Sequence, residues 1–134
     1  MISQSVKSQT TAEFLIIMAF VLIISISMLG AIQYKRTEKL NEKTDIILKN
    51  VATNIQSEIN LAFKSSNGYE REFELPDEIM GKEYNASVID GAVYVRTLDE
   101  KHAIVLSTHK ISGELNIGNN LIKKQNNTIY INNE

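Results

Sequence analysis

The chain has 134 residues, a formal net charge of -2 from 16 acidic and 14 basic side chains, and no cysteine. This length allows one compact domain at most, and a charge so close to neutral creates no field that would concentrate nucleic acid or acidic ligands. Without cysteine there are no disulfides, thiolate metal sites or cysteine nucleophiles. The composition argues against a large enzyme and against a nucleic-acid-binding protein.

An uncharged apolar segment covers residues 14–32, and Ser25 and Ser27 are its only polar members. As an α-helix it would be about 28 Å long, close to the ~30 Å hydrocarbon core of a bilayer. A buried helix of a soluble protein is the alternative, but the remaining residues are too few to cover such a helix on every side. We therefore predict that residues 14–32 cross a membrane.

The residues before this segment differ from an ordinary secretory signal, because Lys7 is their only basic side chain and Glu13 directly precedes the apolar run. The nine residues that follow Ser8 are QTTAEFLII. They resemble the archaeal class III signal peptide of type IV pilin-like proteins, in which Gln, any residue, Ser, any residue, Glu and three further residues lead to Leu. Thr11 stands at the position of Ser and Ile17 at that of Leu, whereas Ser8 stands where Gly often precedes the cleavage site.

The resemblance implies that residues 1–8 are a leader, which a prepilin peptidase removes between Ser8 and Gln9. Gln9, Thr11, Glu13 and Ile17 would form the signal and assembly motif. The N-terminal helix would then bind other copies of the chain or related pilins. The protein would lie in the cell membrane before assembly and afterwards in a surface filament, with its C-terminal domain extracellular.

Glu13 lies at the predicted edge of the hydrocarbon, where a carboxylate costs several kcal/mol unless it is hydrated or paired. The resemblance implies that its partner is the new N-terminal amine of a neighbouring subunit. The alternative is an interfacial Glu that interacts only with the positive end of its own helix dipole.

The basic residues around the apolar segment indicate an orientation in the membrane opposite to the one that the leader implies. Four of them follow the segment and one precedes it, so the positive-inside rule would place the C-terminal part in the cytoplasm. Acidic residues are interspersed among these cations, which is typical of a helix face that packs. We therefore keep the orientation that the leader implies. The basic residues are Lys7, Lys35, Arg36, Lys39 and Lys43. Glu38 and Glu42 lie between the last of these, and Asp45 follows Lys43.

Apolar residues continue at spacings of three, four and seven after the segment, and no helix breaker occurs before Gly68. One helix is therefore predicted over residues 9–66, and the domain boundary is placed at the Ser-Ser-Asn-Gly sequence of residues 65–68. We expect Ile55, Ile59, Ala62 and Phe63 to pack on the following domain. The opposite helix face, which includes Asp45 and Glu58, is expected to be solvated.

In residues 67–134 the apolar residues recur with a period of two in place of the helical period. This pattern predicts a small antiparallel β-rich domain and an α+β fold class. Asp90-Gly91 is a strong hairpin signal and makes residues 84–108 a three-stranded meander. Turns are expected around Gly81, Gly113 and residues 118–120. The candidate strands are residues 71–75, 84–89, 92–97, 103–108 and 128–131.

The sequence carries few residues in patterns that support chemistry. His102 and His109 lie at the ends of one candidate strand, have no metal-ligand spacing and are expected to be exposed. No nucleophile motif or glycine-rich phosphate loop is present. We therefore expect no catalytic residue, metal, cofactor or small-molecule substrate. Five acids, Glu70, Glu72, Glu74, Asp77 and Glu78, could hold calcium, but alternating acids are more typical of an edge strand that discourages aggregation.

Asn85 and Asn126 begin N-glycosylation sequons and are candidate acceptors. A composition this rich in Asn, Ser and Thr yields such sequons by chance, so they do not argue for export.

These observations lead us to expect a non-enzymatic subunit of an archaeal type IV pilus-like surface filament, either a major or a minor pilin. The alternative is a single-span, membrane-anchored extracellular binding module that does not polymerise. The mature N-terminus separates the two, because an anchor has no need of Gln9 as its first residue.

Overall fold

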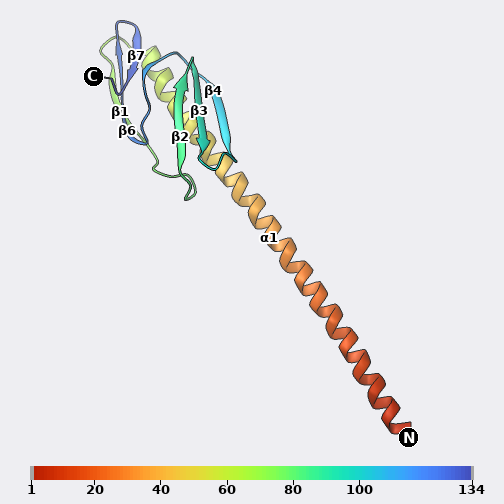
Figure 1. Cartoon of the computed structure of the whole chain (residues 1–134). Coiled ribbons are helices and arrows are strands. Elements are labelled where there is room, and N and C mark those ends of the chain that lie inside the picture. Colours follow the sequence, from red (N-terminus) through yellow and green to blue (C-terminus); the bar gives the residue numbers. More distant parts are fainter. Residues whose placement is uncertain (1, 134) are drawn as a thin grey trace. The chain divides into compact units, whose positions relative to one another are not determined.

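The computed structural model describes the backbone of residues 2–133 and the side chains of residues 9–133. Its elements are α1 (Ile2–Lys64), β1 (Glu70–Leu75), β2 (Tyr84–Ile89), β3 (Ala92–Thr97), β4 (Ala103–Ser107), β5 (Ser112–Gly113), β6 (Gly118–Gln125) and β7 (Thr128–Ile131) (Figure 1). The chain divides into two compact units, Met1–Asn41 and Glu42–Glu134. The predicted α+β class is confirmed.

The second unit combines the C-terminal part of α1 with two sheets. One sheet has the order β1-β6-β7-β5 and the other the order β2-β3-β4. Every pairing is antiparallel except that of β5 with β7. The predicted meander is therefore confirmed as β2, β3 and β4. At its first turn, Asp90 and Gly91 have φ values of 51° and 80°, as a two-residue hairpin of the primed type requires.

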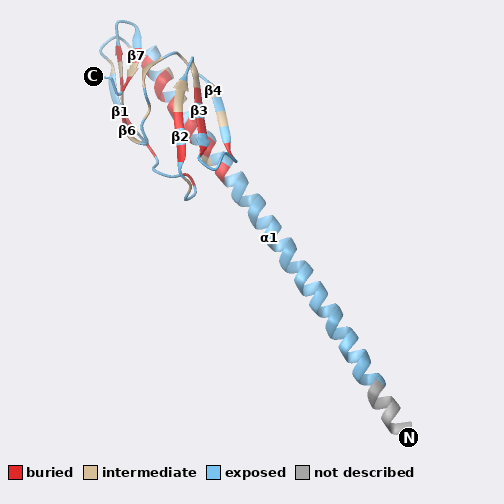
Figure 2. Ribbon diagram, in the orientation of Figure 1, coloured by how far each residue is buried: buried red, intermediate tan, exposed pale blue. Residues whose placement is uncertain are grey.

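The helix supplies one side of the core of this unit. Its buried residues recur every three or four positions and meet buried residues from both sheets (Figure 2). The packing predicted for Ile55, Ile59 and Ala62 is confirmed. Phe63 also contacts the β-rich part, by stacking on the His109 ring, but it is 49% exposed and lies outside the core. The helical core residues are Leu48, Val51, Ala52, Ile55, Ile59 and Ala62.

The boundary between the units differs from the one that the sequence predicts. It falls between Asn41 and Glu42, not at Gly68. The physical reason is burial: from residue 9 to residue 43 every described side chain is exposed, and the first buried one is Thr44. Residues 42–64 therefore belong to the β-rich unit, because their apolar face is part of its core.

The segment 118–120, predicted as a turn, is instead the start of β6, which is the longest strand described. The buried residues of this strand are Asn120, Ile122 and Lys124. Two of these three residues are polar, so the sequence of this strand lacks the alternation of apolar and polar residues that would have predicted it. The short strand β5 at Gly113 was likewise predicted as a turn, and a Cβ added to Gly113 would lie 1.9 Å from the Ile131 carbonyl oxygen. Only glycine allows β5 to approach β7 this closely.

Strand β4 and the residues on either side of it make three contacts with the helix, each through a helix side chain. His102 Nδ1 lies 2.6 Å from Asp45 Oδ1, and Gln56 Nε2 donates to the Ser107 carbonyl at 2.6 Å. The His109 ring stacks on Phe63 with its centroid 3.6 Å away. The prediction of exposed histidines is therefore wrong: His102 is 7% exposed and His109 is half-buried. Glu58 was also predicted to be solvated, but it is buried and lies 3.5 Å from Arg71.

Candidate membrane and assembly segment

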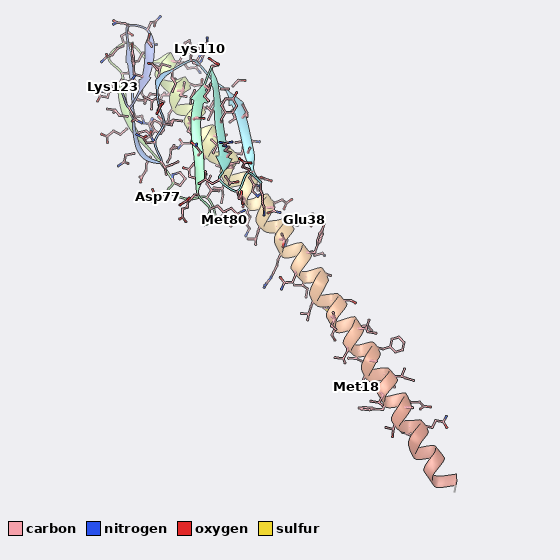
Figure 3. All side chains as sticks on the ribbon, viewed as in Figure 1. Met18, Glu38, Asp77, Met80, Lys110 and Lys123 are labelled. Carbon is pink, nitrogen blue, oxygen red and sulfur yellow. The ribbon has the colours of Figure 1, made fainter. Side chains whose placement is uncertain are left out.

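The apolar segment of α1 is exposed along its whole length. Its large apolar side chains are between 44% exposed, at Met18, and 69% exposed, at Ile26. In Figure 3 the side chain of Met18 projects outward from the helix. The two serines of the segment satisfy their hydroxyl donors within the helix, since Ser25 donates to the Val21 carbonyl and Ser27 to the Ile23 carbonyl, each at 2.8 Å. The segment therefore offers an apolar surface with its hydroxyl groups already bonded.

Within residues 9–133, one helical stretch, Gln9–Lys64, is long and apolar enough to cross a membrane, and none of its apolar window is buried inside the chain. The core helix of a soluble protein, which was the alternative from the sequence, would be mostly buried. The chain thus carries a long apolar N-terminal helix that is compatible with membrane association.

The residues of the signal motif lie on the N-terminal part of α1, and all of them are exposed. Gln9, Glu13 and Ile17 are four residues apart, so they lie along one side of the helix, while Thr11 lies on the other side. The cleavage position at Ser8 and the leader of residues 1–8 have side chains outside the described set.

Glu13 has no basic partner among the described side chains. The first basic residue after it is Lys35, 22 positions along the chain, which is roughly 33 Å along the helix axis. None of the salt bridges within residues 9–133 includes Glu13. A cation that pairs with this carboxylate must therefore come from outside the described part of the chain.

The two candidate glycosylation acceptors are both exposed and lie in different settings. Asn85 is on β2 and lines a hollow of about 290 Å³ with Ser87, Ile89, Tyr94 and Arg96. Asn126 occupies the two-residue turn between β6 and β7, with φ of 48°. Either side chain could be reached by a modifying enzyme.

The structure places few titratable groups where they could act chemically. Among the described residues, no group of three or more His, Asp or Glu side chains is arranged to hold a metal ion. Hydrogen bonds from Thr97, Lys82 and the Lys101 N–H hold the pKa of Asp99 well below its usual range. These bonds fix the turn between β3 and β4 and thus have a structural role.

The exposed apolar helix and the β-rich unit built on its C-terminal part define a class of protein, an α+β protein with one potential membrane anchor. Over residues 5–125 the chain matches DUF7266, a family of unknown function. The chain therefore belongs to this family. Comparison with curated proteins and with solved structures gave no match.

Proposed function

We propose that this chain is a structural subunit of an archaeal type IV pilus-like surface filament, and that a prepilin peptidase removes residues 1–8. In this proposal α1 crosses the membrane before assembly and then packs against the helices of neighbouring subunits. The β-rich unit is displayed at the surface. The observation that carries the proposal is an apolar helical segment with every described side chain exposed and a single carboxylate, Glu13, at its head.

Two physical arguments support this reading. An apolar helix of this length needs either lipid or other helices around it, and a filament core of bundled helices supplies the second. A carboxylate at its head is costly in either setting unless a cation meets it. The amine of a chain that begins at Gln9 is such a cation, and on an incoming subunit it would set the axial register between neighbours.

The rival proposal is a membrane-anchored binding module that never assembles. It uses the same helix as an anchor and requires nothing of Glu13 beyond an interfacial position. The hollow beside Asn85 on the outer face of β2 and β3 is the feature that such a module could use for a ligand.

Glu13→Gln separates the two proposals, because it keeps the size of the side chain and removes its charge. In a filament the substitution leaves an amine unpaired in a dry core, which costs several kcal/mol per subunit. We expect membrane insertion to persist and the yield of sheared filaments, per processed chain, to fall by more than about tenfold. An interfacial Glu would lose only ~0.3–1 kcal/mol of dipole interaction.

Glu38→Gln is the matched control, since Glu38 is an exposed acid on the same helix beyond the apolar segment. Its filament yield should equal that of the unmodified chain. Normal filaments built from processed Glu13→Gln would reject the register role and favour the anchored module.

A further inference from the structure

The outer edge of β4 has main-chain groups for which the described residues show no partner. The bonds from Thr97 N–H to His102 O at 2.9 Å and from Thr108 N–H to Gly91 O at 2.8 Å fix which residues of this strand face β3. By the alternation of an antiparallel ladder, Ala103, Val105 and Ser107 face away from β3. Among the described residues, the one partner on this side is the Gln56 amide, which bonds Ser107 O at 2.6 Å. The edge around Val105 is therefore open.

Strand β1 is an edge of the other sheet, as β2 and β5 are the second edges of their own sheets. Lys124 N–H donates to Tyr69 O at 2.8 Å, so the alternation turns Arg71, Phe73 and Leu75 toward β6 and their neighbours outward. The outward positions are Glu70, Glu72 and Glu74, which are all exposed. Figure 1 shows β1 and β4 at opposite borders of the β strands of this unit.

The two edges differ in charge. Strand β1 carries three outward glutamates, and Lys123, 3.8 Å from Glu70, is the one cation paired with them within the described residues. Strand β4 has no charged residue of its own but is flanked by exposed cations: Arg96 on the neighbouring strand, Lys101 before it and Lys110 after it. Of the nearby acids, Asp99 is bonded to Lys82 and Asp45 to His102. Glu100 adjoins Lys101, and Asp90 precedes Gly91, which lies against Lys110, so three cations stand beside two acids.

We propose that β1 of one copy pairs with β4 of a second copy and so extends the β2-β3-β4 sheet across the two molecules. Two β1 edges repel each other because three glutamates would face three glutamates, whereas β1 beside β4 brings these acids close to Arg96, Lys101 and Lys110. The contact joins two different surfaces, so it leaves one free edge of each kind and repeats from copy to copy as an open row. It concerns the β-rich units alone and does not depend on leader removal or on Glu13.

Cysteine cross-linking tests this contact in the full-length chain, which has no cysteine of its own. Glu72→Cys and Val105→Cys place single thiols at the centres of the two open edges, so they meet whichever way the strands run. The two variants are purified, mixed in proteoliposomes and oxidised. We expect the mixed 72–105 product to exceed both the 72–72 and the 105–105 product by about tenfold. Charge favours β1 beside β4 and opposes β1 beside β1.

Asn119→Cys is the control for random collision, since Asn119 is exposed but lies on β6, inside its sheet. Equal yields of mixed and like products, or a mixed yield no greater than that of Asn119→Cys, would overturn the proposal. Each substituted side chain is exposed, and matching thermal melts by circular dichroism check that each variant is folded.

Charge reversal adds a second readout. Glu70→Lys with Glu74→Lys, made in the Glu72→Cys chain, should lower the mixed product about tenfold, and Lys101→Glu with Lys110→Glu in the Val105→Cys chain should restore it. A yield that is indifferent to both reversals would contradict the proposed pairing. These measurements use unassembled protein in lipid, so their outcome is independent of whether Glu13→Gln abolishes filaments.

Discussion

Lys124, on strand β6, caps the C-terminal end of α1. It lies 60 residues further along the chain than Lys64, the last residue of that helix. It is 7% exposed, and its Nζ donates to the Phe63 carbonyl at 2.6 Å and to the Ser65 carbonyl at 2.8 Å. These are carbonyls that a helix terminus leaves without intrahelical partners, and a cation there also meets the negative end of the helix dipole. Its charge thus serves the fold.

We predict that Lys124→Met lowers the free energy of unfolding by roughly 2 kcal/mol, because hydrogen bonds to a charged donor are lost and two carbonyls lose their partner. The matched control is Lys123→Met at the adjacent position, where the cation makes only a surface pair with Glu70 at 3.8 Å. Its expected cost is about 0–1 kcal/mol. Urea denaturation of both variants measures the difference, and equal costs would rule out the capping role.

Tyr84 makes stability depend on pH in the alkaline range. Its hydroxyl donates to the Pro76 carbonyl at 2.5 Å, and burial, together with the charge of Asp77, raises its pKa to about 12. Since the folded pKa lies above the ordinary value of about 10, the contribution is complete below pH 10 and is lost between pH 10 and about 12. We predict that Tyr84→Phe flattens the fall in melting temperature over this range. Tyr94→Phe, at a more exposed ring, should keep the unmodified slope.

Several residues with structural roles could not be found from the sequence. His102 is buried because a helix residue 57 positions earlier, Asp45, lies against it, and no local pattern encodes that distance. The same holds for Glu58, whose partner Arg71 is on the first strand. The sequence did predict that the four residues of the signal motif lie on the N-terminal helix, and they lie on α1.

At the scale of elements, the strands that alternate clearly were predicted with their bounds. Residues 84–89, 92–97 and 128–131 match β2, β3 and β7. The omission of β6 has a physical cause, because its inward positions include Asn120, which bonds the Asn116 and Gly118 carbonyls, and Lys124, which caps the helix. Hydrophobic periodicity cannot detect a strand whose buried side chains are satisfied by hydrogen bonds.

The helix from Glu42 onward supplies much of the core of the β-rich unit. This predicts that truncating two nearby helix residues, one buried and one exposed, costs very different amounts of unfolding free energy. Ile59 is 0% exposed, whereas Leu61 is 42% exposed. We predict that Ile59→Ala costs about 2–5 kcal/mol of unfolding free energy, through lost burial and a residual cavity, and that Leu61→Ala costs less than about 1 kcal/mol. Chemical denaturation, followed by the loss of β circular dichroism, compares them. Similar costs would mean that the helix does not belong to this core.

At the scale of the whole molecule, two parts of the same helix have surfaces that suit different surroundings. Residues 14–32 present apolar side chains all round, which suits lipid or a bundle of helices, while residues 44–62 bury one face only. The sequence indicated this division through the change from a continuous apolar run to a spacing of three and four. It could not place the boundary at Glu42, because burial by distant strands decides where a compact unit begins.

The measurement that tests the proposed function most directly is mass spectrometry of the N-terminal peptide of this chain in a sheared filament fraction. A filament subunit processed between Ser8 and Gln9 predicts a peptide that begins at Gln9, either free or cyclised to pyroglutamate. Its abundance should rise with that of the filaments. Chains that keep residues 1–8, or that occur in the membrane fraction and never in filaments, would contradict the proposal.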